Sequence, residues 1–267
     1  RIVDLKSNFG KKQAILEGVK ISNGDIIIVS DADCTFNSNW VQKMVSCFVD
    51  SKIKLVSGPV IYKKKTGIFH DLQCLEFISL IGSGAGAIGV GSPIFCNGAN
   101  MAYRKDVFLE LNNFAVDKIV SGDDVFLLHA IKSKYPQSIA FIKDYDSIVT
   151  TNSINKLNDF INQRKRWVAK SSSYKDLASI YVSFLILSLN FIILFLFFYS
   201  LKIFVFFYVV KYIIDLIFLY PKLIFFQRKD LVKWIFPFQF FYSIYVVLIV
   251  VLSFTKRFDW KGRLYRK

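Results

Sequence analysis

The sequence has few of the residues that build disulfide frameworks and zinc sites. It contains four cysteines and two histidines. No two cysteines form a C-x-x-C pair, and none is spaced from a histidine as in known metal sites. We therefore interpret the cysteines as reduced thiols of a cytosolic domain.

Two sequence signals are also missing. The chain opens at Arg1 without a methionine or a signal sequence and enters a strand–helix pattern at once, so we expect its N-terminal portion to be absent. The glycine-rich segment 82–91 lacks the Gly-Lys-Ser/Thr of a P-loop. We predict a mobile loop there rather than a phosphate cradle.

Acidic residues are scarce in the last third of the chain. Residues 179–267 hold three acidic and twelve basic residues, and the whole chain is 54% apolar with 28 phenylalanines. That content is too apolar for an ordinary soluble protein. The net charge of +15 would also suit nucleic acid. However, the basic residues border apolar stretches, which favours an anionic membrane surface and no nucleic-acid partner.

Three apolar stretches are long enough to cross a bilayer. Lys211 and Asp215 interrupt the second, and their i,i+4 spacing allows an ion pair that lowers the cost of burying either charge. The rival interpretation, core helices of a soluble protein, fits the composition poorly. The predicted spans are 180–199, 203–226 and 234–254.

The topology of these spans stays open. Both basic stretches, 222–233 and 256–267, should be cytoplasmic by the positive-inside tendency. A single full span between them would place them on opposite sides. Either one candidate span is interfacial or re-entrant, or one basic stretch departs from the tendency.

The first part of the chain alternates strand and helix patterns, which predicts an α/β domain with a largely parallel sheet. We assign residues 1–170 to this domain and 171–267 to the juxtamembrane and transmembrane helices. Strands are expected at 2–5, 26–30, 54–62 and 139–142, a strand-and-turn element at 95–103, and helices at 11–20, 40–49, 69–81, 123–134 and 156–170.

Asp31-Ala32-Asp33 directly follows the apolar run of the strand at 26–30. Ligands of open α/β sheets bind beyond the carboxyl ends of the strands, so both carboxylates could face one ligand. Such oxygen donors suit Mg²⁺ or Mn²⁺ shared with substrate phosphates. A solvated turn explains the tripeptide alone equally well.

Ser121-Gly122-Asp123-Asp124 opens the helix predicted at 123–134. The pattern resembles a capping box, and acids in a first turn complement the helix dipole. The same position favours an ionised carboxylate, which could accept a proton from a substrate. Taken alone, capping is the better explanation.

Gln163, Arg166 and Trp167 share one face of the helix predicted at 156–170. An amide, a guanidinium and an indole could together bind a phosphate and stack on a sugar ring. A basic and aromatic belt beside the membrane explains them as well.

Together these elements resemble the family 2 glycosyltransferases, which include cellulose, chitin and hyaluronan synthases and ceramide-glucosyltransferase-like enzymes. The resemblance rests on Asp31-Ala32-Asp33, on Gly122-Asp123-Asp124 and on Gln-x-x-Arg-Trp before membrane helices, in family order and spacing. Gly10-Lys11-Lys12 resembles the family's Gly-Lys segment. Asn97-Gly98-Ala99-Asn100 resembles its strand near the acceptor site.

The resemblance implies a GT-A fold, a nucleotide-sugar donor (usually UDP-linked), a divalent metal and inversion at the anomeric carbon. It implies that Asp31 and Asp33 lie against the donor diphosphate and the metal, with Asp33 the more direct ligand. Asp124 would be the general base. The remaining implied donor- and acceptor-binding residues are Lys11, Asn97, Gly98, Asp123, Gln163, Arg166 and Trp167.

The chain departs from the family pattern at two places. The first strand and the acidic motif that hold the nucleotide are not in it, which leaves the nucleotide unidentified. Gly122-Asp123 stands where cellulose-synthase-like members have Thr-Glu, so the base role transfers only to Asp124.

We expect an integral membrane enzyme of a bacterial inner membrane, with a cytoplasmic catalytic domain. It would move a hexosyl or N-acetylhexosaminyl group from the donor to a lipid or glycan acceptor. The alternatives are a processive polysaccharide synthase and a non-catalytic membrane scaffold.

Overall fold

The structure is a computed structural model that describes residues 11–111, 123–171, 173–254, 257–260 and 263–266. It forms two compact units. Unit 1 comprises residues 1–61 and 83–152, and unit 2 comprises residues 62–82 and 153–267. The strand predicted at 2–5 and the cap predicted at Ser121 lie outside the described residues. The domain boundary at residue 170 stays a prediction.

Unit 1 is built on a four-stranded sheet in the order β1-β5-β3-β6. β3 and β6 are parallel, and β5 runs antiparallel to both β1 and β3. Three strands therefore share one direction and β5 alone opposes them, which confirms the α/β class. The strands are β1 (Ile26–Val29), β3 (Leu55–Ser57), β5 (Met101–Arg104) and β6 (Ile139–Phe141).

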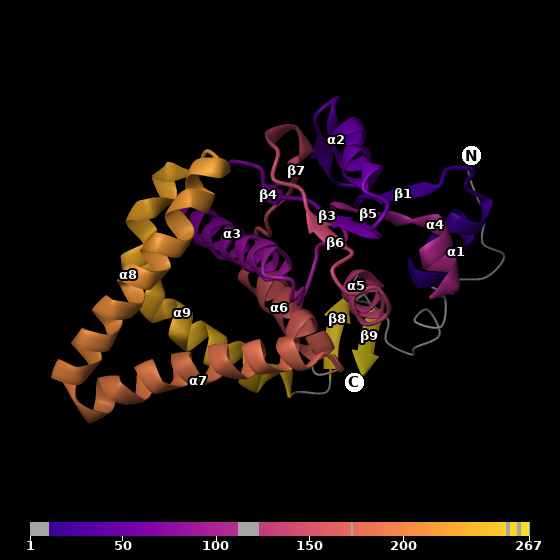
Figure 1. Cartoon of the computed structure of the whole chain (residues 1–267). Coiled ribbons are helices and arrows are strands. Elements are labelled where there is room, and N and C mark those ends of the chain that lie inside the picture. The colour runs from indigo at the N-terminus through magenta and orange to yellow at the C-terminus, as the bar shows by residue number, and fades with distance from the viewer. Residues whose placement is uncertain (1–10, 112–122, 172, 255–256, 261–262, 267) are drawn as a thin grey trace. The chain divides into compact units, whose positions relative to one another are not determined.

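Helices cover this sheet because alternate strand residues on each face are apolar. Leu55, Met101 and Tyr103 are buried in one hydrophobic core with residues from α1 (Lys11–Ile21), α4 (Lys105–Glu110) and α5 (Asp123–Lys134). α2 (Trp40–Ser46), continued by the 3₁₀ turn η1 (Cys47–Val49), lies on the opposite side of the sheet from α5 (Figure 1). The helices predicted near 11–20, 40–49 and 123–134 are confirmed.

The single strand predicted over 54–62 is wrong. The chain forms β3 and then β4 (Val60–Tyr62), which belongs to a second sheet of order β2-β7-β4. The break falls at Gly58, whose N–H donates to the Asn100 carbonyl (2.8 Å). A Cβ at Gly58 would lie 2.3 Å from Asn100 Nδ2, so only glycine permits this approach. The other strands of this sheet are β2 (Thr35–Phe36) and β7 (Val149–Thr151).

The mobile loop predicted at 82–91 is also wrong, because α3 (Ile68–Gly89) continues through most of it. The helix ends in a Schellman motif: Gly91 has φ +74°, its N–H donates to the Ile88 carbonyl, and the Ser92 N–H donates to the Ala87 carbonyl. Small residues suit close packing here. A Cβ at Gly84 would lie 3.2 Å from the Phe95 ring.

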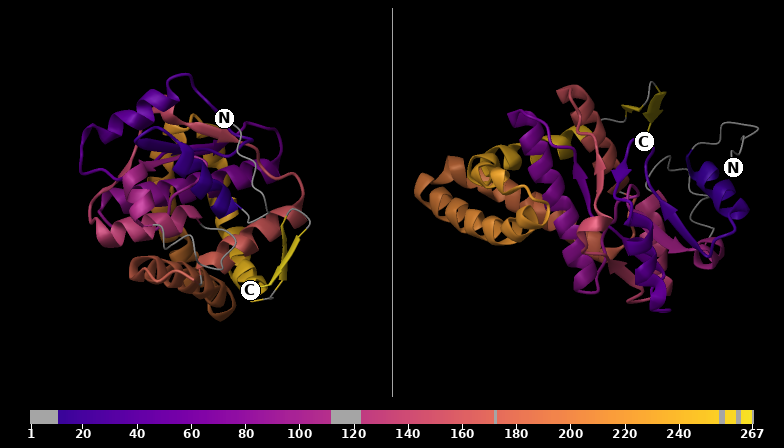
Figure 2. Two further views of the ribbon diagram at one scale, coloured as in Figure 1. Left: turned by 90° about the vertical axis from the view of Figure 1, so that its right-hand side faces the viewer. Right: turned by 90° about the horizontal axis from the view of Figure 1, so that it is seen from above.

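Unit 2 contains the three predicted spans as α7 (Leu177–Tyr199), α8 (Leu201–Phe225) and α9 (Val232–Ser253). Each contacts the other two, and they frame a triangle in Figure 1 and lie close together in the view from above in Figure 2. Within the described residues, four helices are long and apolar enough to cross a membrane, and α3 is the fourth. α3 differs in its burial. In its apolar 18-residue stretch 56% is buried inside the protein, against 11–22% in the corresponding stretches of the other three helices.

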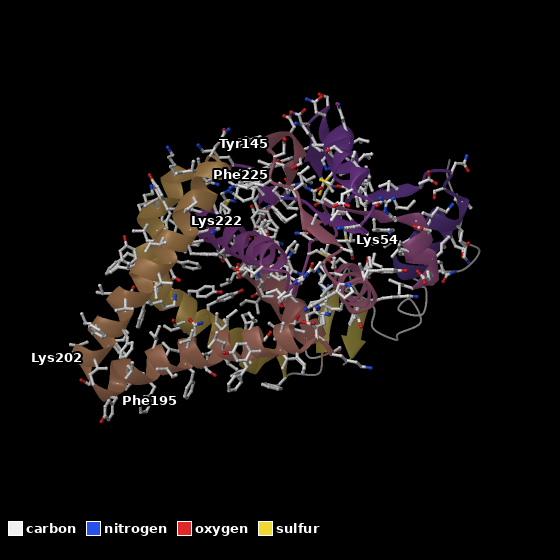
Figure 3. The ribbon with its side chains drawn as sticks, in the orientation of Figure 1. Lys54, Tyr145, Phe195, Lys202, Lys222 and Phe225 are labelled. Carbon is white, nitrogen blue, oxygen red and sulfur yellow. The ribbon has the colours of Figure 1, made fainter. Side chains whose placement is uncertain are left out.

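Charged residues of α8 mark its ends and its middle. Lys202 lies at the α7–α8 corner beside the end of α7 that carries Phe195, and Lys222 and Phe225 lie at the other end of the helix (Figure 3). Twenty residues of helix separate the two lysines, a rise of about 30 Å that matches the hydrocarbon core of a bilayer. Lys211 and Asp215 form the expected i,i+4 ion pair between them.

Side-chain hydrogen bonds join the three spans. Ser243 Oγ in α9 donates to Asn190 Oδ1 in α7 (2.8 Å), and Gln239 Nε2 donates to the Tyr208 carbonyl in α8 (2.9 Å). Polar pairs of this kind hold helices together in lipid, where the hydrophobic effect does not. Beyond α9, β8 (Arg257–Trp260) and β9 (Arg263–Arg266) pair as an antiparallel hairpin in the predicted basic tail.

Candidate active site

The predicted acids of unit 1 gather at one edge of its sheet. β1 ends at Val29, which pairs with Met101, the first residue of the antiparallel β5. The segment after β1 and the turn before β5 therefore lie at the same edge. This is the carboxyl edge of β1, β3 and β6, where α/β sheets bind ligands.

Asp31 and Asp33 lie on a tight turn directly after β1. The Cys34 N–H donates to the Asp31 carbonyl (3.1 Å), which closes the turn. Both aspartates are exposed to solvent. Asp33 Oδ2 accepts a long hydrogen bond from Thr151 Oγ1 in β7 (3.4 Å). Most of the acceptor capacity of the Asp33 carboxylate is therefore left for a ligand.

Asp124 is held in place by two backbone N–H groups. Its Oδ2 accepts from Gly98 N (3.1 Å), and its Oδ1 accepts from Val125 N in the first turn of α5 (2.9 Å). A carboxylate has about four acceptor positions, so roughly half remain available. The predicted capping role and a proton-accepting role are therefore compatible.

Gly98 is needed for this contact because a side chain would fill the space. A Cβ there would lie 3.3 Å from both the Cβ and Oδ2 of Asp124. Asn97 shapes the same turn, since its Oδ1 accepts the Ala99 N–H (2.9 Å). The sequence prediction placed Asn97 and Gly98 near the acceptor. The structure shows that they hold the turn which contacts Asp124.

Asn100 is fully buried and fixes that turn to its surroundings. Its Oδ1 accepts from Trp40 Nε1 (3.0 Å), and its Nδ2 donates to the Pro59 and Ser147 carbonyls (2.8 Å each). One amide thus ties α2, the β3–β4 break and the segment before β7 to the site edge. Sequence reasoning quoted Asn100 in its motif but did not identify this structural role.

Two buried groups beside the acids stay neutral. Burial, aided by the charges of Asp124 and Asp123, holds the pKa of the Cys96 thiol well above its usual range, and Cys96 Sγ donates to the Asp124 carbonyl (3.4 Å). Burial and the Asp123 charge also raise the pKa of the Tyr103 hydroxyl.

The turn after β1 fits a divalent cation that is shared with a ligand. Within the described residues no three His, Cys, Asp or Glu side chains cluster as a complete metal site. Two carboxylates suffice for Mg²⁺ or Mn²⁺ when substrate phosphates and water supply the other ligands. Ser30 Oγ, directly before Asp31, is buried and has no hydrogen-bond partner in the described part of the chain, as expected beside a site that a ligand completes.

The remaining predicted residues lie on other elements. Lys11 begins α1, and its side chain is outside the described residues. Gln163, Arg166 and Trp167 lie half-buried on α6 (Leu157–Ser171), which belongs to unit 2.

Sequence reasoning gave Arg164 no role, yet it joins α6 to α3. Its guanidinium forms a buried ion pair with Glu76 of α3, and the side chains are 3% and 5% exposed. Nη1 donates to Gln163 Oε1, and the guanidinium lies 4.2 Å from the Trp167 ring centroid. The available signal was Glu76 itself, an acid in the middle of an apolar helix.

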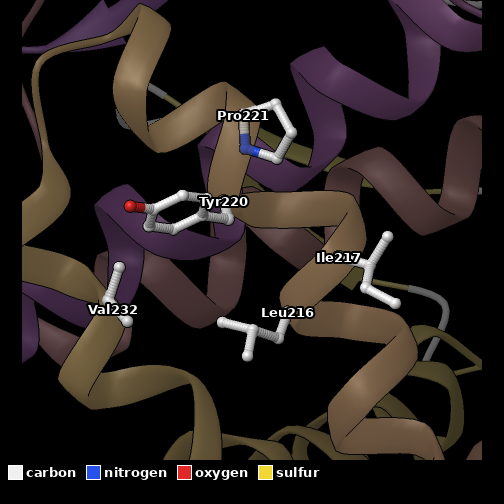
Figure 4. Close-up of a pocket in the computed structure, with 5 residues that line it drawn as sticks. All are labelled: Leu216, Ile217, Tyr220, Pro221 and Val232. Atoms are coloured by element: carbon white, nitrogen blue, oxygen red, sulfur yellow. The ribbon is translucent and has the colours of Figure 1, made fainter.

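A hollow of about 390 Å³ lies between α8 and α9. Leu216, Ile217, Tyr220 and Pro221 of α8 and Val232 of α9 line it (Figure 4). The lining has no charged side chain, so the hollow suits a hydrocarbon chain better than a nucleotide.

Comparisons with known proteins identify the family. The profile of glycosyl transferase family group 2 matches residues 26–260. A poly-beta-1,6-N-acetyl-D-glucosamine synthase of Staphylococcus aureus (strain COL) is 28% identical over 124 residues, 44% of this chain and 29% of that protein. The synthase of the same name from Staphylococcus epidermidis is 31% identical over 102 residues, 36% of this chain and 25% of that protein. The matches thus cover less than a third of these relatives.

Among solved structures, glucosyl-3-phosphoglycerate synthase from Mycobacterium tuberculosis aligns with a TM-score of 0.40 and 15% identity. The alignment covers 61% of this chain and 55% of that one. A likeness of this size adds nothing to the family match.

Proposed function

The chain belongs to the family 2 glycosyltransferases, and on this premise we propose that it transfers a sugar from a UDP-linked donor to a lipid or glycan acceptor. The acceptor hydroxyl would attack the anomeric carbon of the donor at the cytoplasmic face of a membrane. The observation that carries the proposal is the Asp124 carboxylate, which Gly98 N–H fixes at the ligand-binding edge of the sheet with acceptor positions to spare.

In the proposed step, Asp124 accepts the proton of the acceptor hydroxyl. The hydroxyl oxygen bonds to the anomeric carbon as the bond from that carbon to the diphosphate oxygen breaks, and the configuration inverts. Asp31 and Asp33 would hold a divalent cation, which offsets the charge that develops on the departing diphosphate. Gln163, Arg166 and Trp167 are proposed to bind donor and acceptor, with Arg166 adding positive charge near the diphosphate.

A second candidate is a polysaccharide synthase that repeats this step on one product. It is favoured by the names of the staphylococcal relatives, which are synthases of a poly-N-acetylglucosamine. The two candidates share the same chemistry. The length of the labelled product on a gel separates them, because repeated transfer gives a polymer and the first proposal gives one or a few added sugars.

The test is transfer from a radiolabelled UDP-sugar by the full-length protein. We expect Asp124→Asn to lower kcat by about 100- to 10,000-fold, the usual contribution of a general base. Asp106→Asn is the matched control, because Asp106 Oδ1 accepts the N–H of the next residue at the start of α4 as Asp124 Oδ1 does in α5 (2.8 and 2.9 Å). Transfer at the wild-type rate by Asp124→Asn would exclude Asp124 as the base.

The scaffold alternative makes a different prediction. A non-catalytic scaffold would not bind the UDP-sugar, and adding the cation would not change that result. Calorimetric titration of the wild-type protein with UDP-N-acetylglucosamine and UDP-glucose, with and without Mn²⁺, decides between them. Absence of heat in every titration would support the scaffold.

A further inference from the structure

Arg164 lies at the centre of a buried cluster that joins three helices of unit 2. Its Nε lies 3.1 and 3.2 Å from the two oxygens of Glu76 in α3, and its Nη2 lies 2.6 Å from Glu76 Oε2. Tyr245 in α9 donates its hydroxyl to Glu76 Oε1 (2.7 Å). The carboxylate therefore receives every bond from within the protein, and α6 is fixed against α3 and α9.

The same guanidinium contacts two side chains of the proposed ligand-binding set. Its Nη1 donates to Gln163 Oε1. Its Cζ lies 4.2 Å from the ring centroid of Trp167 and 4.4 Å from that of Phe160. These rings stand one helical turn to either side of Arg164, which is the spacing at which side chains share a helix face.

The contact with Gln163 also fixes the direction of its amide. Arginine has only donors, so the atom that faces it must be the amide oxygen. The NH₂ group of Gln163 is therefore turned away from Arg164, where it can donate to an acceptor atom of a ligand. Phosphate and sugar oxygens accept such bonds.

We propose that Arg164, held by Glu76 and Tyr245, is a positioning residue that sets the orientation of the Gln163 amide and the Trp167 indole for substrate binding. The proposal rests on the proposed function, in which Gln163 and Trp167 contact donor and acceptor. Arg164 itself is too buried to touch the substrate. A guanidinium is required because it can form the ion pair, bond the amide and stack on the rings at once.

Arg164→Lys separates positioning from a merely structural role. Lysine keeps a positive charge beside Glu76 and so retains the buried ion pair, but it loses the fork that reaches Gln163 and the plane that stacks on Trp167. We expect the variant to stay folded and its kcat/KM for transfer to fall roughly 10- to 100-fold, as misplaced binding groups do. The KM for one or both substrates should rise more than kcat falls.

Glu76→Met with Arg164→Met is the second variant and guards against misfolding. Replacing a buried ion pair by apolar residues of similar size is often neutral for stability. This double variant should therefore unfold at a temperature near that of the wild type in detergent. It should still show the kinetic defect of Arg164→Lys, because the Gln163 amide and the Trp167 indole have lost their support.

Arg228→Met is the matched control. Arg228 is 3% exposed and pairs with Asp71 of α3 (2.9 Å) and with Asp230, yet no contact described for it involves Gln163, Arg166 or Trp167. It should lower stability while the folded fraction keeps wild-type kcat and KM. An equal kinetic defect in Arg228→Met would overturn the proposal.

The positioning role of Arg164 and the proposed transferase function would be contradicted by different results. If the wild-type protein transfers sugar and both Arg164 variants match its kcat and KM, the positioning role is wrong and the transferase assignment stands. If the wild-type protein neither binds nor transfers the UDP-sugars tested above, the proposed function has failed and the role of Arg164 falls with it.

Discussion

The turn after β1 in unit 1 and helix α3 in unit 2 hold carboxylates in opposite environments. In unit 1, Asp31 and Asp33 are exposed, and the Asp33 carboxylate accepts a long hydrogen bond from the Thr151 hydroxyl (3.4 Å). In unit 2, Glu76 is buried, and an arginine fork and a tyrosine hydroxyl surround it. The Asp33 carboxylate has acceptor capacity left for a ligand. The Glu76 carboxylate instead accepts its hydrogen bonds from Arg164 and Tyr245.

The environment of a carboxylate distinguishes a functional acid from a structural one better than its position in the sequence does. A saturated buried ion pair is costly to break and offers nothing to a substrate. An exposed carboxylate at the edge of a sheet adds little to stability and can take part in chemistry. Asp33 and Glu76 should therefore respond differently to substitution.

The largest difference is expected for Asp33→Ala. The variant should lose the Mn²⁺-dependent part of UDP-sugar binding, because one of the two carboxylates proposed to hold the cation is gone. Its thermal stability should stay within about 0.5 kcal/mol of wild type, as is usual for surface substitutions. Calorimetry and a melting curve check the two halves. Metal-dependent binding that survives in Asp33→Ala would contradict the contrast.

Glu76→Ala should show the reverse pattern in stability. The substitution leaves Arg164 buried without its counter-charge, so we expect a loss of about 3–5 kcal/mol in the free energy of unfolding. Denaturant unfolding in detergent micelles measures it. A loss no greater than that of Asp33→Ala would show that the two kinds of carboxylate are not distinct.

A smaller effect is expected from Gly98→Ala. The added methyl group would press on Asp124 at 3.3 Å and shift it by a few tenths of an ångström. We expect kcat to fall about tenfold, since small displacements of a reacting group are expensive. Gly86→Ala is the control, because nothing lies within 4 Å of its Cβ position. Equal kcat in the two variants would remove Gly98 from the site.

The smallest effect is expected at the exposed pair of Lys43 and Asp144 (2.9 Å). The hydrogen bond from Lys43 lowers the pKa of Asp144. A depressed pKa stabilises the fold above the ordinary value of an aspartate, and that contribution is lost as the pH falls through the folded value. Lys43→Met should therefore melt slightly below wild type near neutral pH, and the gap should close below about pH 4. A gap that widens in acid would contradict this.

The sequence predicted the strand-end position of Asp31 and Asp33 and the helix opened by Asp124 because these depend on local patterns. An apolar run that predicts a strand, and the residues that cap a helix, can each be recognised within a few neighbouring positions. It also predicted the three spans, whose composition is one-sided. The number of spans that cross the membrane was left open, and α3 adds a fourth apolar helix to that question.

The errors occurred where distant contacts decide the structure. Gly58 breaks the strand predicted at 54–62 because Asn100, more than forty residues away, occupies the space of a side chain. The glycine-rich segment stays helical because neighbours such as Phe95 pack against its small residues. The partnership of Glu76, Arg164 and Tyr245 spans three helices, and no spacing rule links them.

The most direct test is to locate donor binding on the wild-type protein with a thiol reagent. Cys34 directly follows Asp33, and Cys47 lies at the end of α2, where burial raises the pKa of its thiol. Both cysteines are half-buried. A UDP-sugar with Mn²⁺ should slow the modification of Cys34, leave the rate at Cys47 unchanged, and lose this effect when a chelator removes the metal. Equal rates at Cys34 with and without donor and metal would contradict a donor site at the end of β1.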